Sequence, residues 1–190
     1  SPPSLPSPLQ GEGSILLGEK GKGFYHPWKI TGHEGGEVMP EARYYEDVKV
    51  GDECITPAVT VTDAHILAYA GVSGDHSPLH VNEEFARTTQ YGTRVAHGLL
   101  GLSVTDGLKT QADYRFQPGI SLGWTWDFVG PIKIGDTVHV KFRVASMRTI
   151  KKPGWGIVFL ASELINQRGE VVQRGEHRLM IPRRNGTGEA

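Results

Sequence analysis

The sequence predicts an α+β domain in which one long buried helix is wrapped by an antiparallel sheet. Helical patterns are confined to residues 62–111, whereas the chain from residue 121 onward alternates apolar and polar residues with the period of a strand. The turns between these strand patterns suit antiparallel connections. An order of one strand, then helices, then a run of long strands is typical of α+β domains.

The size and composition of the chain fit a globular protein. Its 190 residues suffice for one well-filled domain and an appendage, and the apolar content of 38% with 22% charged residues is typical of soluble proteins. The formal net charge of −1 supplies no field that would attract nucleic acid or a membrane surface. The single cysteine, Cys54, excludes an internal disulfide and suits a reducing compartment.

The sequence also bears on location. The longest strongly apolar run, "GIVFLA" at 156–161, is much shorter than the about 20 residues of a membrane helix. The N-terminus lacks the basic and then apolar pattern of a secretory signal. We therefore expect a soluble cytoplasmic protein without nucleic-acid or membrane partners.

Composition divides the chain into three parts. Residues 1–40 form a proline- and glycine-rich arm, which buries too little apolar surface to offset the entropy of ordering it, with "FYHPW" at 24–28 as its one aromatic cluster. Residues 41–184 carry the regular patterns, and 185–190 form a short tail.

The first half of the domain is expected to contain short elements. The β-branched stretch 55–61 predicts a strand, and Thr62 or Asp63 can cap a helix that ends at Gly71. A polar loop, 71–82, follows. Asn82 then caps a second short helix over 83–91, which Gly92 terminates.

The main helix is expected over residues 97–111, with apolar side chains at 99, 100, 102, 104 and 108. Its three glycines, Gly98, Gly101 and Gly107, would each weaken an exposed helix by about 1 kcal/mol relative to alanine. Their presence indicates that the helix is buried and that other groups approach its backbone closely.

Long strands complete the domain. In 121–130, large apolar residues alternate from Leu122 to Phe128, and in 137–147 they alternate from Val138 to Val144. The stretch 154–166 is apolar on both faces, as a central strand would be, and 170–181 supplies the last strand, with the weakest alternation. The turns "GPIKIGD" and "NQRGE" fit antiparallel connections.

The loop "GVSGDHSPLHVN" concentrates chemically active residues. Asp75 and His80 lie five positions apart, and Pro78 between them restricts the backbone and pushes Ser77 toward an extended conformation. Taken alone, Asp75 suits a turn and His80 a packed core residue. A rigid loop with a carboxylate and an imidazole also suits a site that holds a water between two groups.

The segment "YAGVSGDHSPLHVNEEFARTTQYGTRVAHG", from Tyr69 to Gly98, resembles the MaoC-like dehydratases, which include the R-specific enoyl-CoA hydratases. The Asp-to-His spacing, the Pro-Leu-His ending and the Val-Ala-His-Gly block match the family pattern. The segments "YYEDVKVGDEC" and "PIKIGDTV" also look like family segments, so the resemblance covers about 43–182. Ser77 departs from the pattern because the family usually has asparagine there.

The resemblance implies a hotdog fold and reversible addition of water across the 2,3 double bond of an enoyl-CoA thioester. Asp75 and His80 would activate the water, and the Gly98 amide at a helix N-terminus would stabilise the enolate. Ser77 and His97 join Gly98 in the group expected to bind the substrate, although His97 is also read as structural because the family accepts proline there. Coenzyme A would be part of the substrate, with no separate cofactor or metal, and the chain would form at least a homodimer.

Alternatives remain at this stage. The same fold could support an acyl-CoA thioesterase, or a non-catalytic subunit that binds acyl thioesters. A zinc site from Asp75, His76 and His80 is conceivable but lacks a further ligand in a recognised spacing. Ser103 and Asp106 on the main helix suit hydrogen bonding, and Lys151, Lys152, Arg183 and Arg184 suit either coenzyme A phosphates or, more simply, solvated charge.

Overall fold

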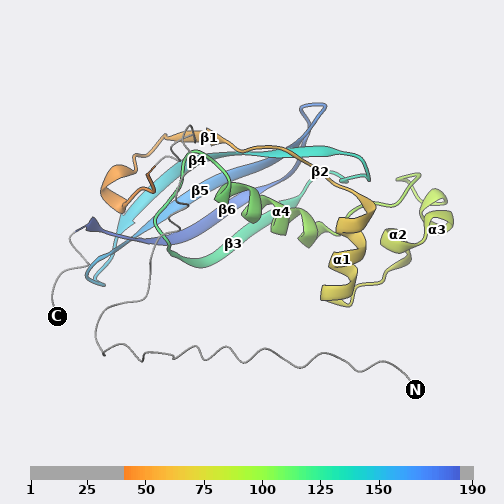
Figure 1. Cartoon of the computed structure of the whole chain (residues 1–190), viewed down its shortest axis with the longest axis horizontal. Coiled ribbons are helices and arrows are strands. Elements are labelled where there is room, and N and C mark those ends of the chain that lie inside the picture. Colours follow the sequence, from red (N-terminus) through yellow and green to blue (C-terminus); the bar gives the residue numbers. More distant parts are fainter. Residues whose placement is uncertain (1–40, 185–190) are drawn as a thin grey trace, which may run out of the picture. The chain divides into compact units, whose positions relative to one another are not determined.

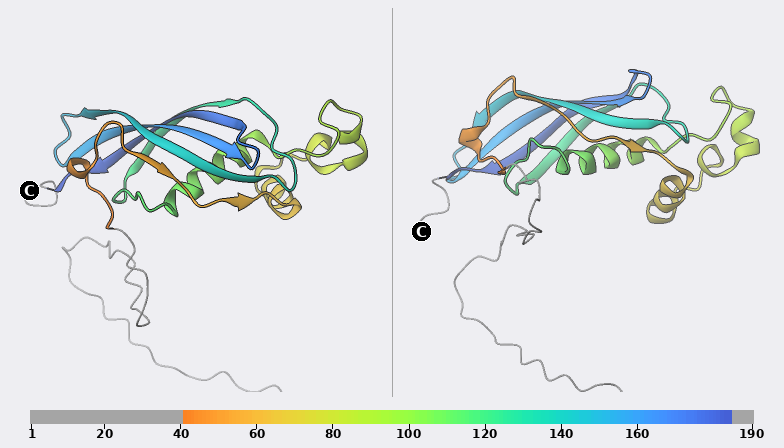
Figure 2. Two further views of the ribbon diagram at one scale, coloured as in Figure 1. Left: turned by 90° about the horizontal axis from the view of Figure 1, so that it is seen from above. Right: turned by 45° about the horizontal axis from the view of Figure 1, so that its top comes forward.

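The computed structural model describes residues 41–184, which fold around a six-stranded antiparallel sheet (Figure 1). The strands follow the spatial order β1-β4-β5-β6-β3, and β2 also pairs with β4. The long helix α4 (Gly98–Thr110) lies along one face of this sheet, as two further views show (Figure 2). The predicted α+β class is therefore confirmed, whereas the predictions for 1–40 and 185–190 lie outside the described residues.

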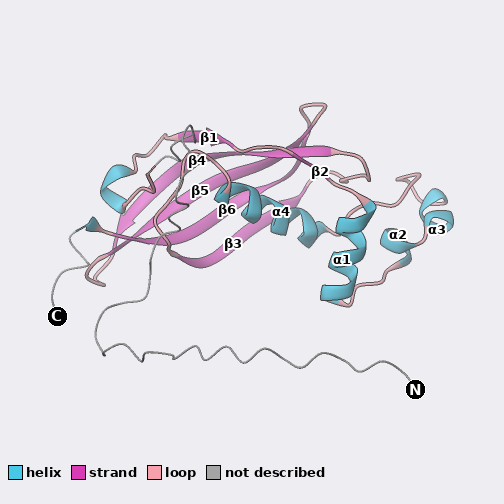
Figure 3. Cartoon of the chain, viewed as in Figure 1, coloured by secondary structure: helices cyan, strands magenta, loops and turns pink. Residues whose placement is uncertain are grey.

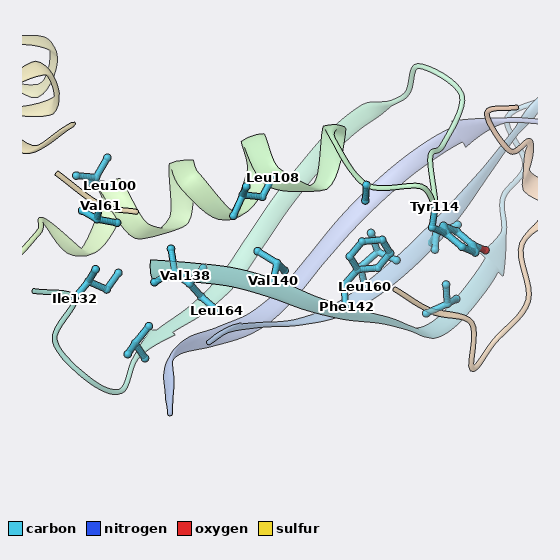
Figure 4. Packing of buried hydrophobic residues seen from close by; sticks show 14 of the residues in the cluster. Val61, Leu100, Leu108, Tyr114, Ile132, Val138, Val140, Phe142, Leu160 and Leu164 are labelled. Atoms are coloured by element: carbon cyan, nitrogen blue, oxygen red, sulfur yellow. The ribbon is translucent and has the colours of Figure 1, made fainter. Parts of the chain in front are cut away.

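The core forms between α4 and the two strands β4 (Thr137–Thr149) and β5 (Trp155–Asn166). The predicted alternation of β4 is confirmed, because one set of its side chains is fully buried: Val138, Val140, Phe142 and Val144. These contact Leu100 and Leu108 of the helix and Leu160 and Leu164 of β5 (Figure 4). β5 lies between β4 and β6, so the prediction of a central strand is also confirmed.

The predicted strand 55–61 is interrupted in the structure. β1 (Glu53–Ile55) and β2 (Val59–Thr60) both pair with β4, but the regular pairing is interrupted between them, where the Thr56 backbone keeps only its N–H bond to the Val140 carbonyl. Thr56 and Pro57 explain the break. The Thr56 hydroxyl donates to the Pro57 carbonyl and accepts from the Val140 N–H, and proline has no N–H for the ladder.

The strand pairing at the β3 edge of the sheet shows that one predicted connection is wrong and that another is correct. β3 (Ile120–Phe128) pairs with β6 (Val171–Pro182) and not with β4. "GPIKIGD" therefore crosses from β3 at one edge of the sheet to β4, which lies next to β1 at the other edge. "NQRGE" does join neighbouring strands, because the Asn166 N–H donates to the Glu170 carbonyl at 3.0 Å between β5 and β6. The weak alternation of β6 reflects Gln173 and His177, two buried polar residues.

Three short helices lie at one end of the sheet (Figure 3). α1 (Asp63–Ser73) has Thr62 as its N-cap and continues past Gly71 to Gly74, whose φ of 76° supplies the left-handed cap that we expected at Gly71. A helix that we did not predict, α2 (Pro78–Val81), lies within the polar loop. α3 (Glu83–Arg87) begins at the predicted cap, Asn82, whose side chain accepts from the Phe85 N–H, but ends earlier than expected. A single-turn helix, η1 (Tyr45–Asp47), precedes β1.

The three glycines of α4 differ in how closely other groups approach them. A Cβ at Gly98 would lie 2.9 Å from the Phe128 ring, and a Cβ at Gly101 would overlap the Gln173 amide, so close approach is confirmed at both positions. Nothing lies within 4 Å of a Cβ at Gly107, so that prediction is wrong there. Within the described part of the chain, no helix is long and apolar enough to cross a membrane.

A polar cluster that the sequence did not reveal anchors the last turns of α4. The buried Lys109 ammonium lies 2.7 Å from His177 Nδ1, 3.3 Å from Asp106 and 4.2 Å from the centre of the Trp124 ring. Trp124 stacks on His177 at 3.9 Å. Burial lowers the pKa of Lys109 to about 8, against the attraction of Asp106, and burial together with the Lys109 charge lowers the pKa of His177 to about 4.

This cluster makes stability depend on pH in a defined direction. Between pH 8 and 10.5, the unfolded chain binds more protons at Lys109 than the folded chain, so this side chain makes the free energy of unfolding rise with pH. Lys109→Met is expected to abolish that rise, as urea unfolding across this range would show. The matched control is Lys151→Met, at an exposed lysine, which should follow the wild type. An unchanged rise in Lys109→Met would contradict the burial argument.

Candidate active site

The candidate site is built on the loop between α1 and α2. The left-handed Gly74 turns the chain at the end of α1, and Ser77 precedes Pro78, the first residue of α2. The Ser73 hydroxyl donates to the Tyr69 carbonyl and accepts from the Asp75 N–H at 3.2 Å. The loop is therefore fixed at both sides of Asp75.

The Asp75 side chain is exposed, and one of its two carboxylate oxygens accepts a hydrogen bond. Its Oδ1 accepts a hydrogen bond of 3.1 Å from the Ser77 N–H, a pattern that closes a local turn. Because a carboxylate offers acceptor sites on both oxygens, capacity remains for a solvent or substrate proton. Asp75 can therefore close the local turn and act as a base at the same time.

His80 comes from α2, the helix that the sequence did not reveal. Its Nδ1 lies 2.7 Å from the Val95 carbonyl oxygen, which can only accept a hydrogen bond. Nδ1 must therefore carry the proton, and in the neutral ring Nε2 is an acceptor. This tautomer equips His80 to accept a hydrogen from a bound water.

His97 lies behind this pair. Only 2% of its surface is exposed, its Nε2 lies 2.9 Å from the Asp75 backbone carbonyl, and its ring stacks on His80 at 3.9 Å with a tilt of 31°. The Tyr69 ring lies 4.9 Å from it on another side. Its Nδ1 is buried without a hydrogen-bond partner among the described residues. The His97 ring thus contacts both the Asp75 loop and the His80 ring, and His97 directly precedes Gly98 in the chain.

The three side chains converge. Asp75, His80 and His97 each offer one donor atom for a metal, and these atoms lie within 4.8 Å of one another. Two acceptors that each lie about 2.8 Å from one water oxygen at a tetrahedral angle are about 4.6 Å apart, which lies within this limit, so the arrangement permits a shared water. The same three side chains are also of the types that ligate zinc, with the two imidazole rings tilted by 31° to each other.

Gly98 begins α4 and has His97 as its N-cap. The first bond of this helix is the one that the Leu100 N–H donates to the His97 carbonyl at 3.0 Å. The N–H groups of Gly98 and Leu99 precede it and have no acceptor within the helix. This helix start can therefore receive a developing negative charge.

The other residues considered from the sequence lie elsewhere or are engaged. Ser77 is exposed, and its backbone rather than its hydroxyl contacts Asp75; His76 is exposed as well. Ser103 donates to the Leu99 carbonyl, and Asp106 pairs with Lys109. Arg183 and Arg184 form ion pairs with Glu46 and Asp47 near the start of the domain, so both arginines are engaged by carboxylates of the protein itself.

Fold and site together define a hotdog-fold protein with a carboxylate–imidazole site beside a helix N-terminus. A Mycobacterium tuberculosis protein described as having a double hotdog fold matches 78% of this chain and 47% of its own at a TM-score of 0.66, with 19% identity, which supports the fold alone. Residues 46–160 match the family described as MaoC like domain. The chain belongs to this family.

Matches in Rhodospirillum rubrum illustrate the relationship. Its (R)-specific enoyl-CoA hydratase is 34% identical over 145 residues, which are 74% of this chain and 93% of that protein. The crystal structure of its MaoC-like dehydratase superposes with a TM-score of 0.68 and 32% identity over 75% of this chain and 99% of that one.

Proposed function

We propose that the chain is a hydro-lyase that adds water to, or removes it from, the 2,3 double bond of an enoyl-CoA thioester. The observation that carries the proposal is the convergence of the Asp75 carboxylate and the His80 imidazole, which each place a ligand atom within 4.8 Å of the other. Membership of the family and the names of its relatives support the same reaction class.

The acceptor pair suggests how the water is activated. A water has two hydrogens, and donating one to Asp75 and the other to His80 leaves its lone pairs free to attack carbon 3. As the carbon–oxygen bond forms, Asp75 takes the proton, and His80 orients the water. General acid–base assistance of this kind typically contributes about 10²–10⁴-fold.

The second requirement is to stabilise the electrons that leave the double bond. They move through carbon 2 to the thioester oxygen, and the N–H groups at the start of α4 receive that oxygen. Asp75 then transfers the proton it accepted to carbon 2, which completes the 3-hydroxyacyl thioester and restores the carboxylate, and the reverse sequence removes water. One donor of this kind is worth about 10²–10³-fold in kcat. The absence of a side chain at Gly98 lets the Phe128 ring pack directly against this helix start.

Every group in this scheme is either a protein residue, a water or part of the thioester. We therefore propose that coenzyme A enters as part of the substrate and that no separate cofactor takes part. We also propose a role in fatty acid metabolism, which this substrate class supports, and a reducing compartment such as the cytoplasm, which the free Cys54 suits.

A spectrophotometric assay over short, long and branched trans-2-enoyl-CoA thioesters tests the reaction. The proposal expects loss of the conjugated double bond with at least one of them, without release of free thiol. Release of thiol would indicate the thioesterase alternative. Failure with every thioester, despite measurable binding, would indicate the non-catalytic subunit.

We also propose a homodimer in which β3 pairs with β3 of a second copy. Within the described sheet, β3 has a strand neighbour on one side only, and a free strand edge is a template for pairing. The edge carries exposed apolar residues: Ile120 at 47%, Leu122 at 40%, Phe128 at 54% and Val129 at 48%. Phe128 also packs against Gly98, so this edge adjoins the helix start.

Charging this edge should favour the monomer. Ile120→Lys combined with Leu122→Lys adds positive charges along the edge at which the two copies would pair, and the repulsion between them is unfavourable. Sedimentation velocity should therefore show a larger monomer fraction than for the wild type. Val72→Lys on α1, where the side chain is 88% exposed, is the matched control and should leave the distribution unchanged. A dimer unaffected by the double change would place the interface elsewhere.

A further inference from the structure

Gln173 is a buried polar residue that the reaction scheme above does not use. It lies on β6, faces α4 and is 2% exposed. Its Nε2 donates a hydrogen bond of 2.9 Å to the Gly98 carbonyl, and its Oε1 accepts one of 2.9 Å from the Trp126 indole N–H on β3. An indole N–H can only donate and a carbonyl can only accept, so this network defines the orientation of the amide.

The surrounding chain makes space for this amide. A Cβ at Gly101 would overlap the Gln173 side-chain amide, and a Cβ at Gly175 would overlap the Thr125 carbonyl oxygen and then Trp126. Glycine at these two positions, on α4 and on β6, thus leaves room for a relay of two hydrogen bonds, from Trp126 on β3 through Gln173 to Gly98 at the start of α4. A polar relay in an otherwise apolar interface is costly unless every group is paired, and here each amide atom of Gln173 has a partner.

The relay acts on the peptide group that matters for the oxyanion. The Gly98 carbonyl and the Leu99 N–H belong to one rigid planar unit, so holding the carbonyl fixes the direction of that N–H. The Gly98 N–H lies one Cα earlier and is constrained through it. The two N–H groups that precede the first bond of α4 are therefore fixed to the sheet as well as to the helix.

We propose that Gln173 is a positioning residue for the oxyanion-binding helix start, with Trp126 fixing its amide. The inference rests on the proposed function, and it adds a residue whose contacts are all with protein groups. Electrostatic stabilisation depends on donors that are already aligned before the reaction, and a misplacement of 1 Å can cost about 100-fold in rate. Loss of the relay should therefore affect turnover rather than binding.

The test compares Gln173→Met with Thr105→Val, using crotonyl-CoA as the thioester. Thr105 is fully buried and donates 2.9 Å to the Gly101 carbonyl, so its variant also removes a buried hydrogen bond to the α4 backbone, one turn further on. Gln173→Met should lower kcat by about 10- to 100-fold. KM should stay within about three-fold, as expected when an interaction of the transition state is lost. Thr105→Val should keep both parameters within about three-fold of the wild type.

Trp126→Phe is a second route to the same effect, because it leaves Gln173 in place but removes the donor that orients its amide. It should lower kcat in the same direction by a smaller factor. Wild-type turnover in Gln173→Met, or an equal loss in Thr105→Val, would overturn the proposal.

An amide spectrum separates this proposal from the proposed function. If the wild type hydrates no thioester, the proposed function fails, and positioning is then judged by the Gly98 and Leu99 amide resonances. These resonances should shift in Gln173→Met and Trp126→Phe and stay in place in Thr105→Val. Equal shifts in all three variants, or none, would overturn the positioning role.

Discussion

Asp75→Asn is expected to lower kcat for hydration by about 10²–10⁴-fold, the usual contribution of a general base. Asparagine keeps the shape of the side chain and an oxygen for the Ser77 N–H, but it cannot take a proton from water. Because the side chain is exposed, the free energy of unfolding should change little. Steady-state kinetics with urea unfolding on the same preparations measures both.

The control for this variant is Asp113→Asn, at another exposed aspartate in a loop. It should keep wild-type kinetics and stability. If Asp75→Asn retained activity within about ten-fold of the wild type, Asp75 would not be the general base, and the catalytic reading of the loop would be wrong.

Gly98→Ala should lower kcat/KM by about 10²-fold or more, comparable to the loss of one oxyanion donor. The new methyl group would lie 2.9 Å from the Phe128 ring, so either the ring or the start of α4 must shift. A shift of the helix start would move the N–H groups proposed to receive the thioester oxygen. Kinetics with crotonyl-CoA would measure this effect.

Gly107→Ala is the matched control because it makes the same change in the same helix. Nothing lies within 4 Å of a Cβ there, so activity should persist. Stability should rise by up to about 1 kcal/mol, since alanine is the better helix former. An equal loss of activity in both variants would mean that Gly98 matters only as a helix residue.

Much of this arrangement can be predicted from local sequence signals. The alternation of Val138 to Val144 and the doubly apolar pattern of 154–166 predict β4 and β5 because burial follows strand period. The Asn82 cap and the spacing of Asp75 from His80 are equally local. These signals depend on neighbours within a few residues, so they remain visible without the fold.

The parts that could not be predicted depend on distant residues. Lys109 and His177 are 68 positions apart, and Gln173 is 75 positions from Gly98, so no local pattern links them. The weak alternation of β6 was the one local sign of these buried polar side chains. α2 was missed because its four residues are too few to show a helical period. The pairing of β3 with β6 likewise joins segments that are distant in the sequence, so the turn that leaves β3 does not reveal it.

The central claim is that water adds at carbon 3 of an enoyl-CoA thioester. Its most direct test is product analysis after incubation with crotonyl-CoA in ¹⁸O-labelled water. The mechanism predicts 3-hydroxybutyryl-CoA with one labelled oxygen at carbon 3 and no free coenzyme A. Labelled free acid together with released coenzyme A, or an unchanged substrate after full occupancy of the site, would contradict it.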